Sequence, residues 1–89
     1  MKKSYMMVSI RKVELNIYPE SKYTYRGDEC DRKKYNHGEV ASWDIIEGED
    51  AKAMCKVIGM DECKELLVLH MSYGSVEVYN NSMVDMFAF

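Results

Sequence analysis

The chain has 89 residues, enough for one domain and too few for two. Hydrophobic residues make up 47% of it, a proportion typical of a chain that folds around a core. The formal net charge of −3 argues against unaided binding to nucleic acid or to an anionic membrane, because both favour a basic face. No apolar run approaches the roughly 20 residues that span a bilayer. We therefore expect a single domain over residues 1–89 that contacts neither nucleic acid nor a membrane directly.

The cysteines indicate a reducing compartment. Their number is odd, so they cannot all pair within one chain: Cys30, Cys55 and Cys63. The start Met1-Lys2-Lys3 resembles a signal peptide, but Arg11 and Lys12 interrupt the apolar region before it reaches export length. The sequence thus predicts a cytoplasmic protein with free thiols.

The first regular segment has apolar residues with a period of two. They occupy even positions from Met6 to Ile10 and odd positions from Val13 to Ile17. A shift of one residue would exchange the buried and exposed faces. An extra residue at Arg11-Lys12, forming a β-bulge, would restore the face, so we expect one bent strand. The alternative is two shorter strands that meet there. Pro19, which has no donor for a ladder, ends the segment.

The middle of the chain is predicted to contain a short strand and a long loop. Tyr23 and Tyr25 alternate with polar neighbours, which indicates a return strand closed by Gly27. Residues 28–39 are polar and show no periodicity, so we expect a loop that is long enough to have a function. Val40–Ile46 contains the single tryptophan and returns the chain to the core.

A helix is expected next. Ala51, Met54, Cys55 and Ile58 follow the i, i+3, i+4, i+7 spacing of one apolar face, and Gly59 stands where a C-terminal cap is expected. A helix of about ten residues is marginal alone and has to dock on a sheet. Residues 61–65 can add one more helical turn.

The last quarter of the chain reads as a three-stranded meander. Leu66–Met71 is apolar, Tyr73-Gly74 is a turn, Val76–Tyr79 alternates, Asn80-Asn81 is a second turn, and Met83–Phe89 alternates again. The predicted fold is a single α+β domain in the order β-β-α-β-β-β. Its antiparallel sheet has about four to five strands, and the helix packs on one face.

Metal binding and catalysis receive little support from residue spacing. The soft ligands are far apart and lack the short paired knuckles of a zinc site: Cys30, His37, Cys55, Cys63 and His70. The glycines are scattered and form no phosphate-binding loop. We expect no catalytic residue, no metal and no cofactor. One enzymatic alternative stays open, a metal-dependent nuclease or toxin-like enzyme that uses Asp44, Glu47 or Glu49 with His37.

Acidic residues form two clusters in the sequence. The first contains Asp28, Glu29 and Asp31, and the second contains Asp44, Glu47, Glu49 and Asp50. If the long loop folds toward the helix start, the seven carboxylates share one rim that can imitate a phosphate row and occupy a basic groove on a partner. We take these residues as the candidate partner-binding site. The alternative is a solvated surface that keeps a small protein soluble.

In its short single domain, its acidic stretches Gly27–Asp31 and Asp44–Asp50, and its lack of a recognisable active site, the chain resembles the small inhibitor proteins of phages and mobile elements. Anti-CRISPR proteins are the best-known group of these. The resemblance implies a non-enzymatic protein that binds a CRISPR effector nuclease and blocks its nucleic-acid surface or its conformational cycle. The basic triplet Arg32-Lys33-Lys34 departs from a pure DNA-mimic surface.

A homodimeric structural module is the third hypothesis. An open sheet edge would join the two copies, either at the first strand or at Met83–Phe89. The apolar C-terminal run Met86-Phe87-Ala88-Phe89 favours this arrangement. The chain is accordingly expected to be either a monomer or a homodimer.

Overall fold

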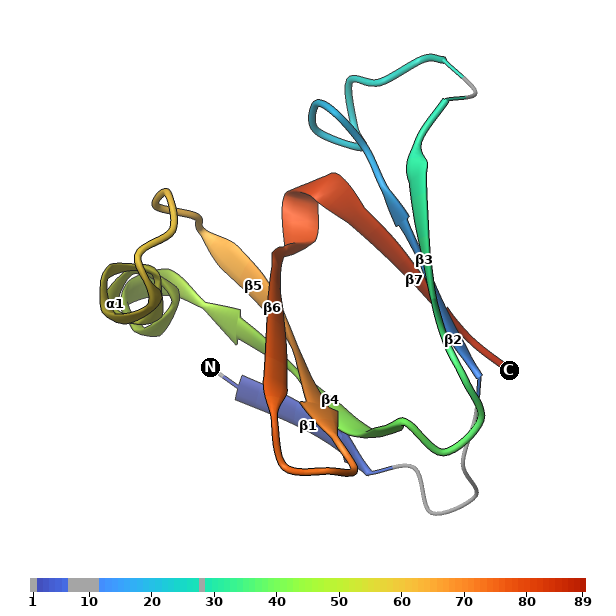
Figure 1. The fold of residues 1–89 in the computed structure, drawn as a ribbon. Coiled ribbons are helices and arrows are strands. Elements are labelled where there is room, and N and C mark those ends of the chain that lie inside the picture. The colour runs from blue at the N-terminus through green and yellow to red at the C-terminus, as the bar shows by residue number, and fades with distance from the viewer. Residues whose placement is uncertain (1, 7–11, 28) are drawn as a thin grey trace.

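The computed structural model describes residues 2–6, 12–27 and 29–89, which fold into an α+β domain with two antiparallel sheets (Figure 1). In chain order its elements are β1 (Lys2–Met6), β2 (Val13–Ile17), β3 (Asp31–Tyr35), β4 (Val40–Glu47), α1 (Gly48–Ile58), β5 (Glu65–Met71), β6 (Val76–Asn80), the 3-10 turn η1 (Asn81–Met83) and β7 (Val84–Ala88). One sheet has the strand order β1-β4-β5-β6, and the other has the order β3-β2-β7. The α+β class is therefore confirmed.

Strand β5 lies at the centre of the structure because both of its faces are buried. Leu67 and Leu69 belong to a cluster between the two sheets, whereas Leu66 and Val68 belong to a second cluster with α1. Side chains alternate across a strand, so a strand that is covered on both sides needs apolar residues at every position. This requirement explains the apolar run from Leu66 to Leu69 in β5.

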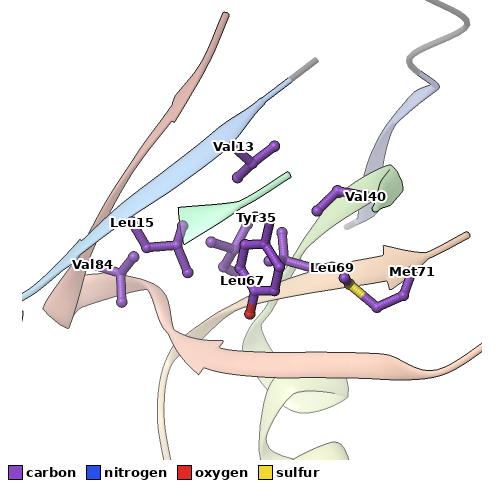
Figure 2. Close-up of a cluster of buried hydrophobic side chains, with 8 residues drawn as sticks. All are labelled: Val13, Leu15, Tyr35, Val40, Leu67, Leu69, Met71 and Val84. Atoms are coloured by element: carbon purple, nitrogen blue, oxygen red, sulfur yellow. The ribbon is translucent and has the colours of Figure 1, made fainter. Parts of the chain in front are cut away.

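The cluster between the sheets is the larger of these two cores (Figure 2). Each sheet contributes part of its inner face, and the buried members are Val13, Leu15, Tyr35, Val40, Leu67, Leu69, Met71 and Val84. Leu15 and Leu69 are fully buried, one from each sheet. Burial of such side chains stabilises a fold by roughly 1.5–3 kcal/mol each, so this layer fixes how the two sheets pack.

The predicted helix is confirmed, and glycines mark both of its ends. Gly48, with φ of 64°, turns the chain directly from β4 into α1, and Gly59, with φ of 78°, caps the other end. Ala51 and Cys55 are buried against the sheet. Ile58, however, is 48% exposed, so the predicted apolar face is covered only in part.

The prediction of one bulged N-terminal strand is wrong. β1 pairs with β4, whereas β2 pairs with β3 and β7 in the other sheet. The two halves of the alternating pattern are therefore separate strands, as in the alternative reading. Residues 7–11, which include one residue of the expected bulge, lie outside the described part of the chain.

The predicted loop over residues 28–39 contains a strand, β3. Four of its five residues are exposed, and only Tyr35 is buried. An edge strand needs one partner for its backbone and few apolar side chains, which is why its sequence resembles a loop. The expected strand at Tyr23–Tyr25 is instead a turn around residues 22–24, held by the Thr24 and Tyr25 amides on the Ser21 carbonyl. The further helical turn expected over residues 61–65 is not formed, because residues 61–64 are not helical and Glu65 begins β5.

The C-terminal meander is correct for β5 and β6 and wrong for the last strand. The Asn80 side chain accepts a hydrogen bond from the Ser82 amide and caps η1, so the chain turns a corner here rather than forming a hairpin. β7 then pairs with β2 in the other sheet. The predicted single sheet of four to five strands is thus replaced by two sheets. In the described part of the chain, four strands, β1 to β4, precede the helix, where two were predicted.

Candidate functional site

A pocket of about 240 Å³ opens at one tip of the β3-β2-β7 sheet. Its lining comes from the end of β2 and the beginning of β3: Ile17, Tyr18, Pro19, Glu29, Cys30 and Asp31. The strand register places these two segments together, because Ile17 pairs with Asp31. Pro19 cannot donate to the ladder and directs the chain away from β3. We call this feature the tip pocket. It joins an apolar wall to a wall with two carboxylates.

Tyr18 fixes the apolar wall of the tip pocket. Its hydroxyl donates a hydrogen bond to Asp85 Oδ2 at 2.9 Å, and its ring lies 5.4 Å from the ring of Tyr25. The hydrogen bond to Asp85 raises the pKa of Tyr18, because the neutral phenol is the form that donates. The phenol therefore stays a donor to Asp85 at neutral pH, and the pocket wall is tied to β7.

Lys22 adds a second connection between the loop around the tip pocket and β7. Its Nζ donates to the Val84 carbonyl at 3.1 Å and lies 3.6 Å from Asp85 Oδ1. The Lys22 amide also donates to the Ser82 carbonyl at 2.8 Å. These contacts hold the segment after β2 against η1 and β7. The wall of the tip pocket that this segment forms is therefore fixed in place.

The carboxylates of the tip pocket belong to the first predicted acidic cluster. Glu29 and Asp31 are exposed, whereas Cys30 is half-buried between them. Asp28 lies outside the described residues. The structure thus places two of the three acidic residues at the mouth of one pocket, where they can meet a cation that enters from solvent.

The second predicted cluster lies at the junction of β4 and α1. Glu47, Glu49 and Asp50 are all exposed there. Glu49 is 3.7 Å from Lys52 Nζ, and the negative charges face the positive end of the helix dipole. This helix start lies far across the molecule from the tip pocket (Figure 1). The two clusters therefore do not share one rim, and the condition for a continuous phosphate-like row is not met.

Asp44 has a different environment from the other predicted site residues. It is buried, as are Ser42 and Ile46, its neighbours on the same face of β4. Its Oδ2 is hydrogen-bonded to His70 Nε2 from the neighbouring strand β5. Both side chains lie on the sheet face that also carries α1, since Asp44 is opposite Val68 and Ser42 is opposite His70. Asp44 is thus the buried member of a polar pair with the half-buried His70 and does not contribute to an exposed acidic surface.

The residues of the nuclease hypothesis are not brought together. His37 lies in the turn before β4, and Glu47 is the last residue of that eight-residue strand. At about 3.3 Å per residue, the length of β4 alone places Glu47 roughly 25 Å from the turn that contains His37. Asp44 is bonded to His70 instead.

The soft metal ligands considered above are also dispersed. Cys55 and Cys63 lie in the core beside α1, and Cys30 lines the tip pocket. Among the described residues, no three side chains of His, Cys, Asp or Glu form a group that could hold a metal ion.

Sequence reasoning identified Glu29 and Asp31 but missed the apolar wall of the tip pocket. In the sequence, Ile17, Tyr18 and Pro19 indicate only the end of a strand. Their role depends on the pairing of β2 with β3, and β3 itself was not predicted. The Asp44–His70 pair was also missed, because polar Ser42 and Asp44 alternate with apolar Trp43 and Ile45, a pattern that predicts an exposed Asp44.

Within the described residues, no helix is long and apolar enough to cross a membrane. Comparisons with protein-family models, curated proteins and solved structures give no match for this chain.

Proposed function

We propose that this protein is a non-enzymatic, cytoplasmic inhibitor that binds a partner protein through its tip pocket. The observation that carries the proposal is the pairing of an apolar wall with the carboxylates of Glu29 and Asp31 around a space of about 240 Å³. Such a site suits the side chain of lysine or arginine, whose stem is apolar and whose end is a cation. It receives the basic side chain of a partner, and no reaction follows.

The resemblance to anti-CRISPR proteins gives the proposed partner its class, a CRISPR effector nuclease. The nucleic-acid surfaces of such proteins are rich in lysine and arginine, because these side chains neutralise phosphates. An inhibitor that engages one of these cations competes with nucleic acid at that position. Charge complementarity also speeds the encounter of the two proteins.

The basic residues of β3 limit the mode of binding. Arg32, Lys33 and Lys34 follow Asp31 directly and are exposed. Successive residues of a strand point to opposite faces, so Lys33 lies on the inner side, with its Nζ 5.5 Å from the ring of Tyr35. Along β3 the negative charge therefore ends at the tip pocket, and the proposal is the capture of one or two cations rather than imitation of a phosphate row.

The test compares two charge reversals that change the net charge equally. One variant carries Glu29→Lys and Asp31→Lys at the tip pocket. The matched control carries Glu49→Lys and Asp50→Lys at the start of α1, where the residues are also exposed and acidic. Affinity for purified CRISPR effector complexes is measured by biolayer interferometry at several salt concentrations, and circular dichroism checks that both variants fold.

We expect the tip-pocket variant to bind at least about tenfold more weakly and to lose much of the salt dependence of binding. The control should stay within about twofold of the unmodified protein, since isolated rim charges contribute little to affinity. Equal losses in both variants would assign binding to overall charge. Unchanged binding in the tip-pocket variant would refute the proposal.

A further inference from the structure

Strand β7 has one backbone edge that no other described strand covers. Within the described residues it pairs with β2 alone. The amide and carbonyl of Phe89 both bond to Lys12, at 2.9 and 2.8 Å, and the amide of Tyr18 donates to the Met83 carbonyl at 2.8 Å. Bonded pairs alternate along an antiparallel ladder, so Asp85 and Phe87 also direct their backbone groups at β2. The backbone groups of Val84, Met86 and Ala88 point the other way.

Part of this outer edge is already occupied. The Val84 carbonyl accepts a hydrogen bond from Lys22 Nζ at 3.1 Å. A strand that adds to the edge can therefore use the groups of Met86 and Ala88, but not the Val84 carbonyl. This restriction shortens the available ladder and selects its register.

The edge of β7 differs from the opposite edge of the same sheet. β3 contains Arg32, Lys33 and Lys34, and this density of like charge opposes pairing with a second β3. β7 has the sequence Val-Asp-Met-Phe-Ala, with a single charge, and that charge is held by Lys22 and Tyr18. Phe87 of β7 and Phe89, which directly follows the strand, are 49% and 58% exposed. Of the two edges of this sheet, β7 is thus the one that charge repulsion leaves open to a second copy.

We propose that β7 pairs antiparallel with β7 of a second copy of the chain, about a two-fold axis at Phe87. In this register Met86 bonds to Ala88 of the second copy, and Ala88 bonds to its Met86, which gives two bonded pairs. A register centred on Met86 would instead require the Val84 carbonyl that Lys22 occupies. The chosen axis also places the two Phe87 rings side by side, because non-bonded pairs bring side chains closest.

The dimer has a defined architecture. Its two three-stranded sheets join into one antiparallel sheet with the order β3-β2-β7-β7-β2-β3. The tip pocket lies away from the Met86–Ala88 backbone groups, at the end of the sheet where β2 meets β3. Self-association is therefore independent of the function proposed for the tip pocket, and either can fail without the other.

The first experiment is sedimentation of the full chain over a wide range of concentration, with the variant Ala88→Pro. Proline removes the amide of Ala88, which points away from β2, so the ladder inside one copy is preserved. Ala88 is exposed, so little packing is lost. Two of the four intermolecular hydrogen bonds disappear, and the dissociation constant should rise by about tenfold or more.

Two further variants make the result specific. Phe87→Lys places like charges against each other at the two-fold axis and should also weaken the dimer. Arg32→Pro is the matched control, because its amide points outward from the other edge of the sheet, and it should leave self-association unchanged. Circular dichroism confirms that each variant folds.

Hydrogen exchange gives the residue-level readout. At high concentration the amides of Met86 and Ala88 should be protected, and on dilution they should exchange rapidly. The amides of Phe87 and Phe89 should remain protected at both concentrations, because they bond within one copy. A monomer at every concentration would overturn the proposal. Protection of the Met86 and Ala88 amides only when a different protein is added would also overturn it. So would an Arg32→Pro variant that weakens the dimer as much as Ala88→Pro does.

Discussion

The hydroxyl groups of Tyr35 and Tyr79 lie 2.7 Å apart and join the two sheets. Tyr35 ends β3, and Tyr79 belongs to β6, so each comes from an edge strand of its sheet. Tyr35 is buried, which raises its pKa, and the hydrogen bond with Tyr79 raises the pKa further. The pair is thus a polar contact between sheets whose main interface is apolar.

We predict that removal of either hydroxyl destabilises the fold. Tyr35→Phe or Tyr79→Phe should lower the free energy of unfolding by about 1 kcal/mol, because each leaves the other hydroxyl without its partner. The double variant should cost less than the sum of the two, which urea denaturation of all four proteins measures. Tyr73→Phe, at an exposed tyrosine, serves as the control and should change stability by less than about 0.5 kcal/mol. Strict additivity would show that the pair does not interact.

Alkaline pH should destabilise the protein through Tyr35. The unfolded phenol loses its proton near pH 10, whereas the folded phenol retains it because its pKa is raised. The unfolded state then binds fewer protons, so the free energy of unfolding falls as pH rises above about 10. Thermal unfolding between pH 8 and 11 should show this loss, and Tyr35→Phe should have a shallower dependence on pH. An identical slope in both proteins would contradict the assignment.

The hydrogen-bonded pair of Asp44 and His70 should be coupled in stability. Asp44 is buried and its Oδ2 is bonded to His70 Nε2, so Asp44→Asn or His70→Gln should each destabilise the protein by about 1–3 kcal/mol. A double-mutant cycle should give a coupling energy of at least about 0.5 kcal/mol. The matched control is Asp50→Asn, which changes an exposed carboxylate and should be nearly neutral. A coupling energy near zero would mean that the contact contributes nothing.

The three cysteines should differ in their reactivity toward alkylating reagents. Cys55 and Cys63 are buried beside α1, and burial raises the pKa of the Cys63 thiol. Cys30 is half-buried and lines the tip pocket, so reagent can reach it. Mass spectrometry of the native protein with iodoacetamide should show rapid modification at Cys30 and modification of the other two only after denaturation. Rapid labelling of Cys55 or Cys63 in the folded protein would contradict the packing of α1.

The sequence determined the local elements that depend on short-range physics. The apolar spacing from Ala51 to Ile58 and the glycine that follows defined α1, because helix periodicity and capping act within a few residues. The apolar run of β5 and the alternation of β6 likewise identified two strands. The unbroken character of the β5 run also indicated cover on both faces, although it was interpreted only as a strand.

Tertiary structure alone decided how these elements combine. β3 is mostly exposed, and its own residues do not indicate a strand. It forms because the backbone of β2 pairs with it. β7 leaves β6 at the corner made by η1, since backbone pairing with β2 and burial of Val84 determine its sheet. The tip pocket and the separation of the two acidic clusters follow from this pairing. Charge and composition are set along the chain, but the distance between two charges depends on which strands meet.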